Sequence, residues 1–284
     1  MTKIINGKEI SAYLKNKIKD EVAALKQNNI NVGLAVIMVG NNPASKVYVA
    51  NKEKACEQLG IISYKYELPE DTTNEQLLEL IQKLNSDNNV NGILCQLPLP
   101  NHLDEKLIIN SINPEKDVDA FHPQNVGKIM IGDYDYLPCT PAGVIEMLNY
   151  ENIDITSKNC VVIGRSNIVG KPMAMLLLHN NGTVTICHSK TKNLKEICRS
   201  ADILVAAIGK PRFVTADMVK PGAVVIDVGI NRCEDGKLCG DVDFENVQNV
   251  ASAITPVPGG VGPMTIALLM KNTVTAAKKM NFNK

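Results

Sequence analysis

The 284-residue sequence contains no tryptophan, and aromatic residues make up only 4% of it. Its 30 basic and 30 acidic residues give a formal net charge of zero, without a run of lysines and arginines. We therefore expect neither nucleic acid nor an anionic membrane surface as a partner. No apolar stretch reaches the roughly 18–20 residues that a membrane span needs. Charges throughout Met1–Asp20 also argue against a signal peptide.

The sequence also lacks the spacings that are typical of metal sites and redox motifs. Its eight cysteines are scattered without a C-x-x-C pair, and several lie in apolar segments, where a free thiol behaves as a small hydrophobic side chain. Its four histidines show no metal-ligand spacing. We therefore expect free thiols, a reducing cytoplasmic location and no metal.

Short apolar runs alternate with helical patterns along the chain, which predicts an α/β protein. The strand-like runs are nearly continuous in apolar residues, as in parallel sheets covered on both faces. At this length we expect two α/β domains, the second a Rossmann-like doubly wound parallel sheet, with a cleft between them. The expected helices cover 7–27, 43–59, 73–85, 141–148 and 264–279, and the expected strands cover 32–39, 61–68, 92–96, 160–163, 183–187, 203–208, 224–228 and 253–255.

The middle of the chain, residues 113–137, is rich in Pro, Asp, Gly and His and has little periodicity. This composition favours a binding loop or a crossing between domains. We assign residues 1–139, together with the C-terminal helix 264–284, to one domain and residues 140–263 to the other.

A glycine loop follows the apolar run at 160–163. Gly164 and Gly170 bound it, and Pro172 suits the first turn of the helix that follows. Glycines let the backbone approach a ligand, and the N–H groups at a helix start favour an anion. The loop is a candidate site for a dinucleotide pyrophosphate, although the spacing lacks the three-glycine fingerprint and an ordinary strand-to-helix connection is the alternative.

The next apolar run, 183–187, ends without an acidic residue. NAD-binding folds usually place an Asp or Glu there for the ribose hydroxyls, whereas this sequence has His188-Ser189-Lys190-Thr191-Lys192. Arg165 adds a cation after the first glycine. Because cations attract a ribose phosphate, the pattern favours NADP over NAD, and a solvated turn is the alternative.

The helix predicted at 43–59 carries a lysine in an apolar stripe. Tyr48, Ala55 and Leu59 share this stripe at about 100° per residue, and Lys52 falls within it. Burying a lysine is costly unless it is paired or neutral. The functional interpretation is an amine whose pKa is lowered by desolvation, so that it handles protons near neutral pH. The alternative is a side chain that extends to the surface.

Further polar features lie at predicted strand ends and in loops. Gln96 ends a buried strand, where ligands of α/β folds bind. Asp117 and Asp119 lie in the irregular middle segment, where acids often only form turns. The segment Pro258–Thr265 contains three glycines and two prolines between a strand and a helix, which predicts close backbone approach to a ligand.

Taken together, these motifs resemble the bifunctional methylenetetrahydrofolate dehydrogenase/methenyltetrahydrofolate cyclohydrolase family, in its short, bacterial-type form. The resemblance covers the chain from about Ile5 to the terminal helix. One departure is Ala120, where the family usually has glycine. The motifs are Ser45–Lys52, Gln96–Pro100, Lys116–Asp119, Pro138–Pro141, Gly164–Ser166 and Pro258–Thr265.

The resemblance implies NADP-dependent oxidation of methylenetetrahydrofolate to methenyltetrahydrofolate, followed by hydrolysis to 10-formyltetrahydrofolate. These are reactions of one-carbon metabolism. It implies that residues 1–139 with the terminal helix bind the folate, that residues 140–263 bind NADP, and that the protein is a homodimer. The implied catalytic residues are Lys52, Tyr48, Gln96 and Asp119.

In this resemblance Lys52 is the catalytic lysine, Gln96 holds its amine, Tyr48 stacks on the folate and Asp119 binds the pterin edge. Leu97, Pro258, Gly259 and Gly260 complete the implied substrate contacts. The implied cofactor contacts are Gly164, Arg165, Ser166, Ser189, Ile230 and Thr140.

Two other functions fit parts of the pattern. A dehydrogenase-only relative would have lost hydrolysis, but the presence of both Lys52 and Gln96 argues against it. A non-catalytic NADP- or folate-binding protein would keep the fold alone, and the joint presence of Tyr48, Lys52, Gln96 and Asp119 disfavours it.

Overall fold

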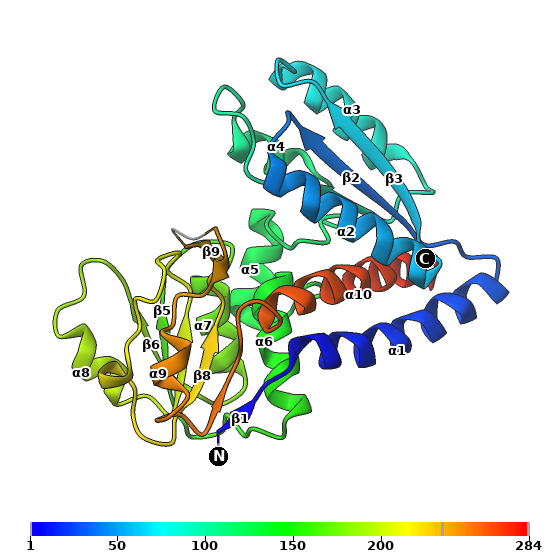
Figure 1. The fold of residues 1–284 in the computed structure, drawn as a ribbon. Helices are drawn as coiled ribbons and strands as arrows, with labels where there is room; N and C mark the ends of the chain where they lie inside the picture. Colours follow the sequence, from blue (N-terminus) through cyan, green and yellow to red (C-terminus); the bar gives the residue numbers. More distant parts are fainter. Residues whose placement is uncertain (1, 234–235, 283–284) are drawn as a thin grey trace. The chain divides into compact units, whose positions relative to one another are not determined.

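The computed structural model describes residues 2–233 and 236–282 (Figure 1). The chain divides into two compact units. Unit 1 contains the segment up to Ala12 and Pro138–Thr265, and unit 2 contains Tyr13–Leu137 and the chain from Ile266 onward. Two helices, α1 (Gly7–Gln27) and α10 (Val261–Phe282), contribute residues to both units.

Unit 2 is built on a three-stranded parallel sheet in the order β3 (Ile62–Leu68), β2 (Gly33–Val39), β4 (Gly92–Cys95). All seven residues of β2 are buried, as expected for a central parallel strand covered on both faces. Figure 1 shows α2 (Pro43–Leu59) and α3 (Asn74–Ser86) on opposite sides of this sheet. At the edge, β3 alternates between exposed and half-buried residues, so the expectation that both faces are covered is wrong for this strand.

The helix ends of unit 2 follow from local sequence. Asn42 caps α2 by accepting hydrogen bonds from Ala44 N and Ser45 N, and Gly60 ends it in the left-handed conformation. A capping box between Thr73 and Gln76 begins α3. Two shorter helices, α4 (Glu105–Ser111) and α5 (Pro123–Ile131), complete the unit. The presence of α5 corrects the expectation of an irregular middle segment: His122 caps it, Pro123 begins it and Gly132 ends it.

Unit 1 is built on a six-stranded parallel sheet, as the doubly wound prediction requires. Its first strand comes from the start of the chain, where Lys3 and Ile4 pair with Ala253 and Ile254. Two residues are too few to give a sequence pattern, so this strand was not predicted. The strand order is β1 (Lys3–Ile4), β11 (Ala253–Ile254), β8 (Val224–Asp227), β7 (Ile203–Ala206), β5 (Asn159–Ile163), β6 (Thr183–Cys187).

Helices and a hairpin complete unit 1. The hairpin is the antiparallel pair β9 (Asn231–Arg232) and β10 (Leu238–Cys239). Apolar residues of β5, β7 and β8 pack with residues from the later loops and helices into one core. The helical elements are α6 (Cys139–Tyr150), α7 (Gly170–His179), α8 (Leu194–Arg199), the 3₁₀ turn η1 (Ala216–Met218) and α9 (Phe244–Val247).

The cysteines differ in part from the expectation of free thiols. Six are free and buried, but Cys233 and Cys239 form a disulfide in the β9–β10 hairpin. The two residues are six positions apart, so no C-x-x-C spacing announces the bond. The hairpin, which the sequence pattern did not predict, brings them together.

Candidate active site

Lys52 lies on the buried face of α2, as the apolar stripe predicts. Only 8% of its surface is exposed, and Val49, Ala55 and Cys56 share its face. Glu53 and the other charged residues of the stretch 53–57 are exposed. Tyr48, one turn earlier, is 39% exposed, so its ring is available at the surface of unit 2.

A hydrogen bond joins Lys52 to Gln96. The amine Nζ donates to Gln96 Oε1 at 2.8 Å, so the lysine does not simply extend to solvent. Gln96 follows the last residue of β4, and its Nε2 donates to the carbonyl of Leu97 at 2.6 Å. This second bond turns the amide oxygen toward the amine. The structure therefore brings together two residues that are 44 positions apart in the sequence.

Asp119 lies near the same strand end. The segment before it runs parallel to β4, because Ile93 N donates to Lys116 O at 2.7 Å and Ile93 is the bridge partner of Asp117. Burial, and then the charge of Asp119, raises the pKa of the neighbouring Cys95 to about 12. Asp119 itself is half-buried. Residues of α2, β4 and the 116–119 segment thus converge at the carboxyl end of β4.

The two aspartates of the Asp-Val-Asp motif differ in their surroundings. Asp117 is buried, and its Oδ2 accepts hydrogen bonds from His122 N and Asn125 Nδ2, both at 2.8 Å. Burial raises the pKa of the Asp117 carboxyl, against the lowering effect of these bonds. Asp117 therefore holds the start of α5, which is the turn-forming role that the sequence left open.

Ala120 occupies a conformation that suits glycine. Its φ is 58°, in the left-handed region, and its side chain is fully buried. The adjacent loop is held from α10, where Asn272 Nδ2 donates to Val118 O at 2.8 Å and to Leu137 O at 2.9 Å. The backbone conformation that glycine favours is thus kept here with an alanine.

In unit 1, both glycines of the 164–170 loop are required by close packing. Gly164 has a φ of 137°, and a Cβ there would lie 2.2 Å from the carbonyl oxygen of Ala207. A Cβ on Gly170 would lie 2.3 Å from the carbonyl oxygen of Gly164. The loop therefore folds tightly between β5 and the start of α7.

Ser166 organises this loop. Its Oγ accepts hydrogen bonds from Val169 N and Gly170 N, both at 3.2 Å, and its carbonyl accepts from Lys171 N at 3.0 Å. With its oxygen used as an acceptor, the hydroxyl hydrogen is the group that it can offer to an anion. The loop has the glycines, the hydroxyl and the helix start that a pyrophosphate site needs.

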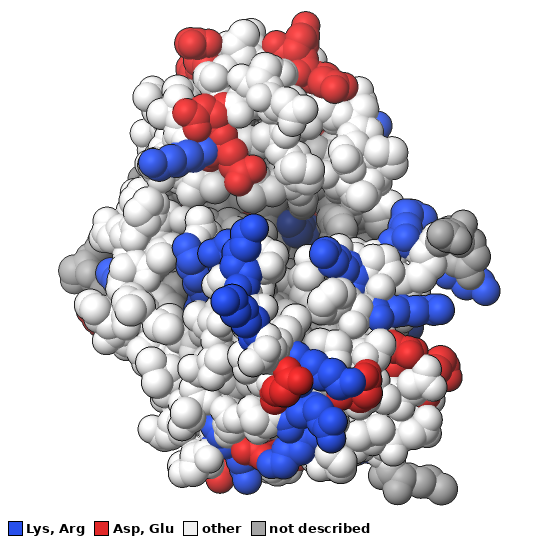
Figure 2. All heavy atoms as spheres, turned by 90° about the vertical axis from the view of Figure 1, so that its left-hand side faces the viewer, with Lys and Arg blue, Asp and Glu red and all other residues white. Residues whose placement is uncertain are grey.

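The carboxyl end of β6 carries a tight turn without an acidic residue. His188 N donates to Thr191 Oγ1 at 2.8 Å, and Thr191 N donates to His188 O at 2.8 Å. Ser189 is exposed on this turn, as is Arg165 on the glycine loop. Figure 2, which looks from the side on which Figure 1 draws β6 and α8, shows lysine and arginine side chains gathered on that face.

Two buried carboxylates fix the loops after β7 and β8. Asp227 accepts hydrogen bonds from Gly229 N (3.0 Å), Asp241 N (2.9 Å) and Val242 N (2.9 Å). Burial raises its pKa to about 6, in spite of these bonds. Asp241, which is fully buried, was not singled out from the sequence, although Gly240-Asp-Val-Asp243 resembles the earlier Asp-Val-Asp motif.

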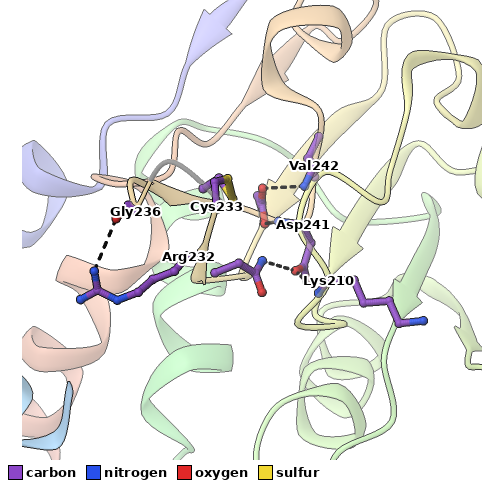
Figure 3. The surroundings of a disulfide bond; sticks show 9 residues. Lys210, Arg232, Cys233, Gly236, Asp241 and Val242 are labelled. Atoms are coloured by element: carbon purple, nitrogen blue, oxygen red, sulfur yellow. Dashed lines mark hydrogen bonds between the residues drawn. A yellow bond between two sulfur atoms is a disulfide. The ribbon is translucent and has the colours of Figure 1, made fainter. Parts of the chain in front are cut away.

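The Asp241 carboxylate accepts four hydrogen bonds. Asn231 Nδ2 donates at 2.9 Å, and the other three come from the loop after β7: Ile208 N (2.6 Å), Gly209 N (3.0 Å) and Lys210 N (2.9 Å). Figure 3 shows Asp241 between this loop and the β9–β10 hairpin.

The proline- and glycine-rich loop at 258–262 is tightly packed, and its approach to a ligand stays a prediction. The Val257–Pro258 peptide is cis, and Gly259 has a φ of 107°. A Cβ on Gly260 would lie 2.5 Å from the carbonyl oxygen of Pro256. Ile230 is 47% exposed, and its Cδ1 would lie 3.7 Å from a Cβ at Gly262.

Thr140, on α6, also reaches the start of α10. Its Oγ1 lies 3.1 Å from Oγ1 of Thr265. In unit 2, the other implied substrate residue, Leu97, is half-buried and precedes Pro98 through a cis peptide.

The described ranges, 2–233 and 236–282, contain no group of three or more His, Cys, Asp and Glu residues that could hold a metal ion. These ranges also contain no helix that is both long and apolar enough to cross a membrane.

Unit 1 has a doubly wound parallel sheet with a glycine loop between β5 and α7. Unit 2 has a buried lysine whose amine is bonded at the carboxyl end of β4. Together these features define the class of nicotinamide dinucleotide-dependent α/β enzymes. Comparison with known families gives the particular family. Residues 5–119 match the catalytic domain of tetrahydrofolate dehydrogenase/cyclohydrolase, and residues 138–281 match its NAD(P)-binding domain. The chain belongs to the tetrahydrofolate dehydrogenase/cyclohydrolase family.

Relatives and solved structures agree with this assignment. The bifunctional protein FolD of Acetivibrio thermocellus is 66% identical over 276 residues, which are 97% of each chain. The crystal structure of the bifunctional enzyme FolD from Campylobacter jejuni has a TM-score of 0.96 and 52% identity, covering 98% of this chain and 99% of that one. The Trypanosoma brucei enzyme, complexed with NADP and an inhibitor, has a TM-score of 0.94 and 38% identity over 98% of each chain.

The family assignment confirms the resemblance that the six sequence motifs indicated. It confirms the two-domain α/β fold, the bifunctional enzyme class and the nicotinamide dinucleotide cofactor. The roles of individual site residues stay predictions.

Proposed function

We propose that this chain oxidises methylenetetrahydrofolate to methenyltetrahydrofolate with NADP and then hydrolyses the product to 10-formyltetrahydrofolate. One observation carries the proposal: within a chain of this family, the buried Lys52 amine is hydrogen-bonded to Gln96 at the carboxyl end of β4. Both residues belong to the motifs expected for hydrolysis as well as oxidation. Most of the residues that would bind the folate belong to unit 2, and those that would bind the dinucleotide belong to unit 1.

Lys52 is the proposed acid–base group. Burial disfavours the charged form, so the amine can act neutral beside a substrate that becomes cationic on oxidation. Gln96 Oε1 orients the amine by accepting one of its hydrogens, which aims the nitrogen lone pair away from the amide. A neutral amine in this position can accept a proton from the water that attacks the methenyl carbon.

Tyr48 and Asp119 are the proposed folate contacts. The half-exposed ring of Tyr48 offers an aromatic face to a flat heterocycle. The Asp119 carboxylate, near the end of β4, is an acceptor suited to the N–H groups of the pterin's amino-pyrimidine edge. Leu97, Pro258, Gly259 and Gly260 are the further proposed substrate contacts.

The residues of unit 1 suit NADP. When bound, the nicotinamide supplies the hydride acceptor, and the protein supplies position. The proposed pyrophosphate contacts are Ser166 and the backbone from Gly164, in a loop folded so tightly that a Cβ on Gly164 would collide with the backbone of Ala207. Arg165 and Ser189 are proposed to bind the ribose phosphate, in a corner where β6 ends without an acid. Ile230 and Thr140 are proposed for the nicotinamide end.

The proposed setting is a homodimer in the cytoplasm that contacts neither nucleic acid nor membrane. A spectrophotometric assay with purified enzyme, methylenetetrahydrofolate and NADP tests the function. Reduction of NADP followed by decay of the methenyl absorbance supports both activities. Reduction of NADP without acceleration of that decay would identify a dehydrogenase-only enzyme, and binding without turnover would identify a sensor.

A further inference from the structure

The two cysteines of the β9–β10 hairpin differ from the other six. Burial raises the pKa of the Cys56, Cys95 and Cys198 thiols to about 12 and that of Cys160 to about 11, and it raises the pKa of Cys187 as well. Such thiols carry almost no thiolate at neutral pH and are chemically inert. Cys233, in contrast, is half-buried in a surface hairpin, where a soluble thiol can reach its sulfur.

The hairpin positions the two sulfurs on one face. Arg232 pairs with Leu238 and Asn231 with Cys239, and the turn is closed by hydrogen bonds from Cys233 N to Lys237 O and from Gly236 N to Cys233 O, both at 2.9 Å. Cys233 and Cys239 are therefore diagonal neighbours across the two strands, with Cα atoms 6.3 Å apart. That separation lies within the usual range for a disulfide.

A hydrogen bond also joins the beginning of the hairpin to a buried residue just beyond its end. Asn231, at its beginning, donates to the carboxylate of Asp241, two residues beyond its end, at 2.9 Å (Figure 3). The same carboxylate accepts the three backbone N–H groups of Ile208, Gly209 and Lys210. The hairpin thus holds the acceptor that fixes the loop after β7.

The loop after β8 is fixed by the same group of contacts. Asp227 accepts hydrogen bonds from both Gly229 N and Asp241 N. Packing is close, because a Cβ on Gly229 would lie 2.3 Å from Cγ of Asp241 and a Cβ on Gly240 would lie 1.8 Å from Oδ2 of Asp227. Asp241 therefore contacts both loops closely, so a displacement of its carboxylate would disturb the hydrogen bonds of each.

The disulfide adds a covalent constraint to this hairpin. Only two residue pairs form its ladder, and a two-stranded hairpin of this kind is at best marginally stable alone. With the bond reduced, the short ladder and the Asn231–Asp241 hydrogen bond still join the ends of the hairpin, and Asp241 keeps its backbone hydrogen bonds to Val214 and Asp227. Reduction therefore acts through Asn231, which is one of the four donors to the Asp241 carboxylate that fixes the loop after β7.

We propose that Cys233 and Cys239 form a thiol–disulfide site whose oxidised form holds the loops after β7 and β8 in the conformation that binds the nicotinamide dinucleotide. The proposal rests on the proposed function in one respect, the binding of NADP at the strand ends of unit 1. It adds a modification site, with a soluble dithiol as the reductant.

A thiolate of the dithiol attacks the more accessible Cys233 sulfur, the S–S bond breaks, and Cys239 leaves as a thiolate that takes up a proton. The second thiolate of the reductant then displaces Cys233, which is protonated in turn. The protein gains two electrons and two protons, and the dithiol becomes a disulfide.

The test combines a thiol count with cofactor affinity on the full chain. Enzyme is incubated with glutathione disulfide or with dithiothreitol, freed of reagent, and alkylated in denaturant. Of the eight cysteines, six should react after oxidation and all eight after reduction. The Kd for NADP, measured by calorimetry, should rise at least about five-fold on reduction, the lower end of usual coupling between sites.

Two variants serve as controls. The double variant Cys233→Ser/Cys239→Ser should bind NADP with the affinity of the reduced enzyme under both conditions. Leu238→Ser changes the exposed neighbour of Cys239 and leaves both sulfurs, so it should keep the redox response.

Eight reactive thiols after oxidation, equal NADP affinities of the two wild-type forms, or a redox response that persists in the double serine variant would each overturn the proposal. Failure to bind NADP in either state would instead contradict the proposed function, while the thiol count would still report whether the site forms.

Discussion

Replacement of Lys52 by methionine separates the chemical role of the amine from its structural role. Methionine has a similar length and fills the same apolar stripe between Val49 and Ala55. The variant loses the hydrogen bond to Gln96 Oε1, and such a bond contributes about 1 kcal/mol net. Because Gln96 is half-buried, water can replace the amine as its donor. We expect the free energy of unfolding to change by no more than about 1.5 kcal/mol.

The expected catalytic loss is much larger. A positioned acid–base group contributes roughly 10²–10⁴-fold, equivalent to about 2.7–5.4 kcal/mol. Lys52→Met should therefore lower the rate constant for methenyltetrahydrofolate hydrolysis by at least about 100-fold. Decay of the methenyl absorbance measures hydrolysis, equilibrium binding measures the folate Kd, and denaturant unfolding reports the fold. Folate binding should largely survive.

Gln96→Leu provides the matched comparison. If the amide acts by orienting the amine, the double variant Lys52→Met/Gln96→Leu should hydrolyse no more slowly than Lys52→Met alone, because contacting residues are not additive. Hydrolysis by Lys52→Met within about ten-fold of wild type would refute the acid–base role of this lysine.

Four further outcomes are expected. Asp119→Ala should raise the KM for methylenetetrahydrofolate by roughly 10- to 150-fold, since hydrogen bonds to a charged group contribute about 1.5–3 kcal/mol. An unchanged KM would show that another residue binds the pterin. Arg165→Ala should weaken NADP binding by a similar factor, less so at high salt, and leave NAD binding nearly unchanged; equal losses for both dinucleotides would assign Arg165 to loop structure. Ala120→Gly should leave the free energy of unfolding unchanged or raise it by up to about 1 kcal/mol, because removing the strain of a left-handed alanine slightly exceeds the entropy cost of glycine. A decrease of more than about 1 kcal/mol in denaturant unfolding would contradict this expectation. The pKa of Asp227 is raised to about 6 in the folded protein from an ordinary 3.8, so the native state binds more protons between these values. The stability from this group therefore falls by roughly 2 kcal/mol as pH rises from 4 to 6. Unfolding curves across this range should lose that part of the slope in Asp227→Asn, and identical slopes would contradict the assignment.

Local patterns determined much of the fold. The continuous apolar residues of β2 require cover on both faces, and Asn42, Pro43 and Gly60 set the ends of α2 within the sequence itself. The stripe that contains Lys52 follows from the helical period alone, so the burial of this lysine was predictable. The motifs also sufficed for the family assignment, since each depends on neighbouring residues.

Contacts between distant segments were not predictable in the same way. The Lys52–Gln96 bond spans 44 positions and depends on α2 packing against the sheet in which β4 pairs with β2. The sequence could not distinguish Asp117, which holds the start of α5 from a buried position, from Asp119, which lies half-buried near the strand end. Burial decides between these roles, and burial is a property of the packed chain.

The loops of unit 1 depend most strongly on contacts between segments that are distant in the sequence. Asp241 receives its four donors from Asn231 and from residues 208–210, and no periodicity links these segments. The disulfide was missed because a two-residue ladder leaves no pattern, although it brings Cys233 within reach of Cys239. The sequence by itself determined the elements that neighbouring residues specify, whereas only the tertiary structure decided which polar groups meet, because a buried donor must find its acceptor wherever the chain brings one.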